Sequence, residues 1–186
     1  KKKCAWCLNQ FEDYEKYHDE EWGVPVHDDL THFEFLVLEG AQAGLSWATV
    51  LKRRSGYRNA FAQFDVNTVA LFTENDIQRI LQDPGIIRNK LKVRSVVNNA
   101  QKFIEVQNEF GSFDQYIWGF VNHSPIANQW ASMNEVPATT KESDALSKDL
   151  KKRGFKFCGS TIMYAHMQAC GLVNDHTTDC FRFSEV

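Results

Sequence analysis

The sequence has no apolar run as long as a membrane-spanning helix, and its start, Lys1-Lys2-Lys3-Cys4, lacks the apolar segment of a signal peptide. It also has no overall basic excess: 21 basic and 24 acidic residues give a net charge of −3. This balance argues against a strongly basic nucleic-acid binder, although a local basic face is compatible with it. We therefore expect a cytosolic protein, without a membrane partner, that forms a single domain over residues 1–186.

Strand-like alternation of apolar and polar residues is missing, and so are internal repeats. Apolar residues recur instead at helical spacing over residues 30–43, 46–61, 88–110, 143–152 and 160–169. Asp65 and Thr73 each resemble the N-cap of a short helix, and Thr73 with Asp76 predicts an approximate capping box. Residues 122–140 contain two of the four prolines and little periodicity, which predicts a long loop. The pattern as a whole favours an all-α fold.

The five cysteines cannot all pair, and a reducing compartment disfavours disulfides. Cys158 and Cys170 lie among apolar residues, where we expect them to pack as small hydrophobes. Cys4, Cys7 and Cys180 lie near the ends of the sequence and need a separate explanation.

Metal binding is one such explanation. His176 and Cys180 are four residues apart, a spacing that lets both side chains reach one point. Cys4, Cys7 and His18 offer further nitrogen and sulfur ligands, and a structural zinc site needs four. Spacing leaves two sets open, because either Cys7 or His18 could join Cys4, His176 and Cys180. The alternative is that unrelated ends of the chain carry scattered cysteines and histidines.

Glu39 is the only ionisable residue between Phe35 and Leu51. A carboxylate in so apolar a segment loses its hydration, which is costly unless a cation or strong hydrogen-bond donors meet it. Glu39 is therefore either a structural ion-pair partner or the recognition group of a pocket. We favour the pocket, because aromatic residues and glycines surround Glu39 rather than basic residues.

Aromatic residues could complete such a pocket. Trp47 follows Glu39 by eight residues, and four more cluster near the start: Trp6, Tyr14, Tyr17 and Trp22. Most aromatic side chains belong to the core, so each alone indicates little. Beside a lone carboxylate, these aromatic residues favour stacking on a flat heterocycle. The carboxylate would accept hydrogen bonds from the N–H groups of the heterocycle and stabilise a positive charge on its ring.

Residues 150–162 link the last two expected helices and contain features of an anion-binding turn. Gly154 suits a helix C-cap, and Gly159 permits a close approach just before the helix that begins at Ser160. Unpaired N–H groups at that helix start would bind an anion, helped by the basic side chains of Lys151, Lys152, Arg153 and Lys156. The pattern resembles a helix–hairpin–helix element, at about residues 143–170, that contacts the DNA backbone. The alternative is an ordinary turn with a solvated basic face.

Two further basic clusters could extend a phosphate-binding surface. Lys52, Arg53 and Arg54 follow the Glu39 segment directly. Another four residues, Arg88, Lys90, Lys92 and Arg94, begin a predicted helix, where positive charge is unfavourable unless an anion is present.

Several stretches together resemble the bacterial 3-methyladenine DNA glycosylase I family, the Tag-type enzymes of base-excision repair. The matching stretches are residues 17–25, 38–47, 85–88, 120–123, 144–148, 150–157 and 167–176. They cover nearly the whole chain. The resemblance implies an all-α fold of the helix–hairpin–helix glycosylase superfamily, with a zinc clip joining residues 4–18 to residues 176–180.

The resemblance also implies an activity and its residues. The expected reaction is hydrolysis of the glycosidic bond of N3-methyladenine in flipped-out nucleotides of alkylated double-stranded DNA, which releases free 3-methyladenine and leaves an abasic site. The zinc ligands would be Cys4, His18, His176 and Cys180, and Cys7 would not take part. The base pocket would comprise Glu39, Trp6, Tyr14, Tyr17 and Trp47. Leu45 would wedge into the gap left by the flipped nucleotide.

Superfamily relatives often place a catalytic aspartate after the second helix of the hairpin. Here Asp175 and Asp179 lie beside expected zinc ligands, so we expect neither to act in the reaction. No lysine stands out as a nucleophile, and we expect no lyase step.

Three rival interpretations remain at this level: a non-catalytic DNA-binding module, an enzyme acting on free nucleosides, and a glycosylase that also removes N3-methylguanine. A monomer is the default expectation, since no apolar stripe is left over.

Overall fold

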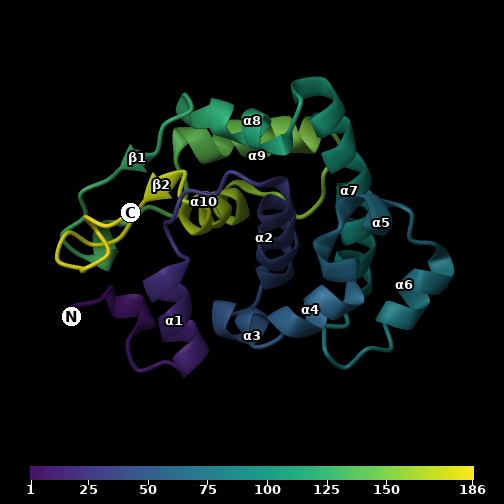
Figure 1. Cartoon of the computed structure of the whole chain (residues 1–186), viewed down its shortest axis with the longest axis horizontal. Coiled ribbons are helices and arrows are strands. Elements are labelled where there is room, and N and C mark those ends of the chain that lie inside the picture. Colours follow the sequence, from purple (N-terminus) through teal and green to yellow (C-terminus); the bar gives the residue numbers. More distant parts are fainter.

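Helices make up most of the computed structural model, which describes residues 1–186 (Figure 1). The α-helices are α1 Glu12–Glu20, α2 Asp29–Gln42, α3 Trp47–Leu51, α4 Arg54–Ala60, α5 Val66–Ala70, α6 Glu74–Ile80, α7 Lys90–Phe110, α8 Phe113–Trp118, α9 Lys141–Lys152 and α10 Ser160–Ala169. Short 3-10 turns are Ala5–Cys7, Ala62–Phe64, Gly119–Val121 and Met133–Glu135. The sequence-based expectation of a helical protein is confirmed.

Helix α2 lies at the centre of the molecule and packs against α10, α7 and α8 (Figure 1). It begins where the side chain of Asp28 accepts a hydrogen bond from the N–H of Thr31, which makes Asp28 the N-cap. Its residues from His32 to Ala41 are all buried, so α2 has no solvent face along most of its length. Any polar residue on it must therefore find a partner inside the protein.

Helix α7 is the longest element and packs against α5, α6 and α8. The sequence predicted its start at Arg88, but the helix begins at Lys90, where Asn89 accepts from the N–H of Lys92. It ends at Gly111, whose φ of +89° favours glycine. The predicted N-caps at Asp65 and Thr73 are also confirmed.

The structure differs from the expected helices in two places. Residues 46–61 form two helices rather than one, because the chain turns at Lys52 and Arg53 and the Arg53 side chain donates to the carbonyl of Pro84. Helix α1 was not predicted. Only Tyr17 and His18 of its nine residues are buried, so it has no apolar period to detect.

The expected loop at residues 122–140 contains a short strand. Strand β1, Ile126–Ala127, pairs in parallel with β2, Val173–Asn174. Two residues are too few to show alternation in a sequence, which is why neither strand was expected. The pairing fixes the segment after α10 against the loop, close to where the chain approaches its end (Figure 1).

The two ends of the chain lie together on one side of the molecule (Figure 1). The N–H of Phe181 donates to the carbonyl of Lys2 at 2.9 Å, and Lys2 pairs with Asp179 at 2.6 Å. None of the helices combines the length and the apolarity needed to cross a membrane.

A buried histidine pair connects α2, α8 and α10. His32 Nε2 lies 3.1 Å from a carboxylate oxygen of Asp114, which can only accept, so His32 donates there. Its Nδ1 must then accept from His166 Nε2, 3.3 Å away. Both imidazoles are fully buried, and burial is the main cause that lowers the pKa of each. The pair is therefore neutral in the folded protein.

Candidate functional site

One pocket of about 230 Å³ lies where the first 3-10 turn, α1, α2, α3 and α10 meet. It contains all five residues that the sequence analysis assigned to a base pocket: Glu39, Trp6, Tyr14, Tyr17 and Trp47. Their gathering at one place is an observation, whereas their role stays a prediction. Trp22, which the sequence analysis named among the aromatic residues near the start, also lines the pocket. The sequence analysis did not assign four other lining residues to the site: Gln42, Met133, Ala165 and Gln168.

Glu39 lies in the last turn of α2 with its side chain buried. Its Oε2 atom has no hydrogen-bond partner, and no basic residue pairs with it. Burial therefore raises the pKa of Glu39 from its ordinary value of 4.5 to about 8. The negative end of the helix dipole gives no compensation at this position. The carboxyl group is thus neutral at pH 7 and lies in a site that lacks a positive charge.

Aromatic rings form the walls around Glu39. The ring of Trp6 contacts those of Tyr14 and Trp22 edge-on, with centroids 5.6 and 4.9 Å apart. The rings of Tyr17 and Trp47 lie 5.3 Å apart. The cavity is therefore lined by aromatic rings, on which a planar molecule could stack.

Three buried polar atoms at this pocket have no partner: Glu39 Oε2, Trp6 Nε1 and Trp47 Nε1. Buried polar groups are rarely left unpaired, and three around one cavity indicate that a ligand completes them. The burial of Tyr17 and its nearness to Glu39 raise the pKa of its hydroxyl well above the ordinary value. It is therefore a neutral donor. These groups offer the donors of Trp6, Tyr17 and Trp47 and the acceptor of Glu39 to a flat, polar-edged ligand.

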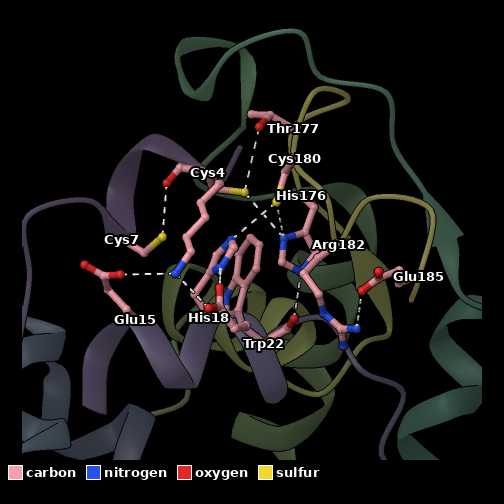
Figure 2. A network of polar contacts seen from close by, with 12 residues as sticks. Cys4, Cys7, Glu15, His18, Trp22, His176, Thr177, Cys180, Arg182 and Glu185 are labelled. Atoms are coloured by element: carbon pink, nitrogen blue, oxygen red, sulfur yellow. Dashed lines mark hydrogen bonds and ion pairs between the residues drawn. The ribbon is translucent and has the colours of Figure 1, made fainter. Parts of the chain in front are cut away.

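Beside the pocket, four side chains point toward one another (Figure 2). They are Cys4, His18, His176 and Cys180; all are buried, and their ligand atoms lie within 4.8 Å of one another. The sulfur of Cys4 lies 3.4 Å from Nδ1 of His176, and that of Cys180 lies 3.5 Å from Nε2 of His18. Two sulfurs and two imidazole nitrogens at this spacing match a tetrahedral zinc site.

The groups behind these ligands orient both imidazoles. His18 Nδ1 lies 2.8 Å from the carboxylate of Asp19. His176 Nε2 lies 2.8 Å from the carbonyl of Trp22 (Figure 2). Both partners are acceptors, so the opposite ring nitrogens carry lone pairs toward the cluster. Without a cation, burial raises the pKa of Cys4 to about 12, whereas a metal would ionise the thiol. The donor set therefore fits a metal ion.

Cys7 does not join this cluster. Its sulfur donates to the carbonyl of Cys4 at 3.2 Å, inside the first 3-10 turn (Figure 2). Spacing had left Cys7 and His18 as alternatives, and the geometry favours His18. The reason is that α1, which the sequence did not reveal, turns His18 toward the end of the chain.

Helices α9 and α10 pack against each other and are joined by a tight turn. Gly154, with φ +94°, ends α9: its N–H donates to the carbonyl of Lys151, and the N–H of Phe155 donates to that of Leu150. Asn99 of α7 holds the turn by donating to the carbonyl of Lys156 and accepting from its N–H. The turn is therefore a rigid element.

The far end of this turn is open. No side chain caps the first turn of α10, whose N-cap residue is Gly159. A Cβ atom at Gly159 would meet nothing within 4 Å, so the space in front of the helix start is free. Ser160 directs its hydroxyl back to Asp144 at 2.6 Å. The helix start thus presents its backbone N–H groups outward.

Comparison with known proteins decides the family. The family model described as methyladenine glycosylase matches residues 6–183. The chain is 50% identical over 178 residues to DNA-3-methyladenine glycosylase 1 of Escherichia coli K12, covering 96% of this chain and 95% of that protein. It is 48% identical to the DNA-3-methyladenine glycosylase of Haemophilus influenzae, covering 96% of each. The chain belongs to the methyladenine glycosylase family.

Solved structures of the family have the same fold. A crystal structure of 3-methyladenine DNA glycosylase I matches with a TM-score of 0.94 and 49% identity, covering 97% of this chain and 98% of the other. A Staphylococcus aureus structure that addresses 3-methyladenine recognition matches with a TM-score of 0.93 and 36% identity, covering 96% and 95%. A related structure, of a tyrosine-to-phenylalanine variant, is a complex with 3-methyladenine.

Most residues of the two basic clusters that were expected to extend a phosphate-binding surface contact other parts of the protein instead, which corrects the sequence analysis. Arg54 is largely buried and pairs with Glu21 and Glu34, both at 2.9 Å. Arg53 donates to the backbone carbonyl of Pro84 at 2.9 Å. Arg54 therefore links α4 to α2 and to the residue that follows α1, whereas Lys52 stays exposed. The sequence analysis missed the acidic partners of Arg54 because they lie far away along the chain.

The cluster at the start of α7 is corrected in the same way. Lys92 donates to the carbonyls of Ala41 and Ala43, so it stabilises the C-terminal end of α2. Arg94 forms a bidentate pair with Glu74. These two residues need no external anion to explain their charge.

Leu45 lies in the turn between α2 and α3, which Gly44 forms with φ +77°. Its side chain is 41% exposed, one of six large apolar side chains exposed in this protein. It stands just past Gln42, a lining residue of the pocket. Its predicted role as a wedge agrees with this position but stays a prediction.

Proposed function

We propose that this protein is a DNA repair glycosylase that removes N3-methyladenine from alkylated duplex DNA and leaves an abasic site. Its family membership and the 3-methyladenine complex of a related structure support this proposal. One observation in this chain carries it: Glu39 has an unpaired buried oxygen in a pocket lined by tryptophan and tyrosine rings.

The charge of the lesion explains why Glu39 suits it. Methylation at N3 gives the adenine ring a positive charge, and this charge is what the pocket lacks. Beside the cationic ring Glu39 can ionise and accept from its exocyclic amine. The faces of Trp6, Tyr17 and Trp47 attract the same charge by cation–π interaction. An unmethylated, neutral base gains neither contribution.

The chemical step needs little help from the protein. The methylated base is a good leaving group because its departure neutralises its own charge, so water can attack the sugar carbon without strong acid catalysis. Asp175 is fully buried and its oxygens are occupied by four donors, so it has no lone pair left to activate water. Asp179 pairs with Lys2. No lysine lines the pocket, which supports a monofunctional enzyme without a lyase step.

DNA binding belongs to the turn between α9 and α10, acting as a helix–hairpin–helix element. The N–H groups at the start of α10, from Ser160 onward, bind a backbone phosphate, and the absent side chain of Gly159 allows its close approach. Lys156 is exposed and adds charge. Leu45 enters the gap that the flipped nucleotide leaves. We expect a monomer acting in the bacterial cytoplasm.

The cluster of Cys4, His18, His176 and Cys180 holds a structural zinc ion. Four protein ligands would leave the ion no open position for chemistry. Its role is to fix the N-terminal segment, which carries Trp6, against the residues that follow β2. The residues of the pocket bind the base, whereas the zinc ion would cross-link the two ends of the chain.

The test is release of free base from duplex DNA treated with dimethyl sulfate, with the products separated by chromatography. We expect release of 3-methyladenine while 7-methylguanine stays in place. Glu39→Gln is the matched variant, because it keeps the shape of the side chain and removes its charge. If a folded, zinc-loaded protein binds duplex DNA but releases no base, the protein is a non-catalytic DNA-binding module. Undiminished excision by Glu39→Gln would refute the pocket assignment.

A further inference from the structure

Charge alone cannot make this pocket selective for adenine. Glu39 and the aromatic walls favour any cationic methylated purine, and N3-methylguanine in DNA carries the same positive charge. The two lesions differ at ring positions 1 and 2 and also at position 6, where adenine has an amine, which donates, and guanine a carbonyl, which accepts. A side chain that tells them apart at position 6 must present a donor or an acceptor in a fixed orientation.

Two glutamines line the pocket, and only one has its amide held in place. Gln168, in the last turn of α10, donates from Nε2 to Asp175 Oδ2 at 2.9 Å, whereas the side chain of Gln42 makes no hydrogen bond. A carboxylate can only accept, so the amide of Gln168 cannot turn over without placing its carbonyl against a negative charge. Its NH₂ group therefore faces Asp175, and its Oε1 has no partner within the protein.

Asp175 is itself immobilised. Its side chain is fully buried and accepts four hydrogen bonds, two on each oxygen. The donors are Asn128 at 2.7 Å, Trp130 at 2.8 Å, Tyr164 at 2.5 Å and Gln168 at 2.9 Å. Two oxygens with two lone pairs each are thereby saturated. Since the donors come from α10 and from the loop after β1, the carboxylate cannot rotate to release Gln168.

We propose that Gln168 is a base-selecting residue and Asp175 its positioning residue. The fixed carbonyl oxygen of Gln168 accepts from the exocyclic amine of methylated adenine and repels the carbonyl oxygen of methylated guanine. The amine has two hydrogens, and Glu39 and Gln168 lie on helices α2 and α10, which pack together and both line the pocket. Each acceptor can therefore take one hydrogen. This inference rests on the proposed function, whose specificity it explains.

The test compares excision of 3-methyladenine and 3-methylguanine from the same methylated duplex. Gln168→Met keeps the length of the side chain but removes the acceptor. We expect its kcat/KM for 3-methyladenine to fall roughly tenfold, as for one lost hydrogen bond to a charged group, while that for 3-methylguanine does not fall. Affinity for the two free bases, followed by tryptophan fluorescence, should change in the same direction.

Two further variants separate selection from stability. In Gln168→Glu an oxygen still faces the pocket, but the new carboxyl can bind Asp175 only while it carries a proton. Selectivity should therefore persist at pH 5.5 and decline at pH 8. Asn128→Ala removes another donor from Asp175, outside the pocket. It should lower the melting temperature and leave the ratio of the two lesions within about twofold, because Gln168 stays anchored.

An unchanged lesion ratio in Gln168→Met, in a protein that excises 3-methyladenine, would overturn the proposal. An equal loss for both lesions with unchanged affinity for the free bases would do the same, since the oxygen would then act on the attacking water. If the unaltered protein releases no base, the proposed function fails instead. The free-base affinities still decide the role of Gln168 in that case.

Discussion

Replacing Glu39 with glutamine should stabilise the free protein while it impairs function. Glu39 is only 3% exposed, and burial raises its pKa from 4.5 to about 8. In the unfolded chain the group ionises near pH 4.5, whereas in the folded chain it keeps its proton up to about pH 8. Folding therefore loses stability as the pH rises through this window.

The size of the effect follows from the shift. One pKa unit corresponds to about 1.4 kcal/mol, so the 3.5-unit gap between 4.5 and about 8 costs up to about 5 kcal/mol above pH 8 and about 3 kcal/mol at pH 7. Glutamine has the same shape and does not titrate. Glu39→Gln should thus match the unaltered protein near pH 4.5 and exceed its free energy of unfolding increasingly toward pH 8.

Urea unfolding at half-unit steps from pH 4.5 to 8.5 measures this difference. A difference that stays flat across the range would refute the reasoning, because it would mean that the carboxyl group is hydrated or paired in solution. The same preparation should excise 3-methyladenine roughly 10- to 100-fold less efficiently, as expected for the loss of a hydrogen bond to a charged group. Stability and activity would then move in opposite directions at one residue, as expected for a functional site.

Three other perturbations test separate parts of the structure. Cys4→Ser should abolish the bound zinc measured by atomic emission and lower the melting temperature, whereas Cys7→Ser should retain one zinc per chain. The glutamine variant above has lost the titration of residue 39, so its pH dependence reports other groups. Its free energy of unfolding should fall below pH 6.5, because burial lowers the pKa of His32 and His166 and the unfolded chain takes up protons first; constant stability down to pH 5.5 would contradict this. Gly159→Val fits a φ of −61° and should leave the melting temperature unchanged but weaken duplex binding in a salt titration; undiminished binding would remove the turn from the DNA interface.

The sequence made the pocket predictable because Glu39 violates a strong rule. A lone carboxylate in an apolar helix is conspicuous without any structure, and the aromatic residues near it narrow its meaning. Gln168 breaks no rule, since glutamine is ordinary in a helix. Its importance depends on Asp175, which lies across a turn and is held by residues from another loop.

The basic residues show the opposite error. Three consecutive basic side chains, Lys52 to Arg54, look like a surface for phosphate because a sequence shows only their neighbours along the chain. Arg54 instead meets Glu34, 20 residues away, and the pair is mostly buried. The local charge pattern therefore indicated that these residues need anionic partners, but it could not show that the partner of Arg54 is a carboxylate of the protein itself. For the same reason, spacing alone could not decide whether Cys7 or His18 is the fourth ligand of the cluster. The resemblance to the family favoured His18.

The cluster of Cys4, His18, His176 and Cys180 determines when the pocket can form during synthesis of the chain. Cys4 contacts His176, and the two residues are 172 positions apart. Trp6, two residues after Cys4, is among the first parts of the pocket to leave the ribosome, yet the partners that hold its segment are among the last. Pairing over such a separation is slow, since a long loop must close first. A nascent chain can thus form α2, which carries Glu39, early. It acquires a complete pocket for a base only once residues 176–180 have been made.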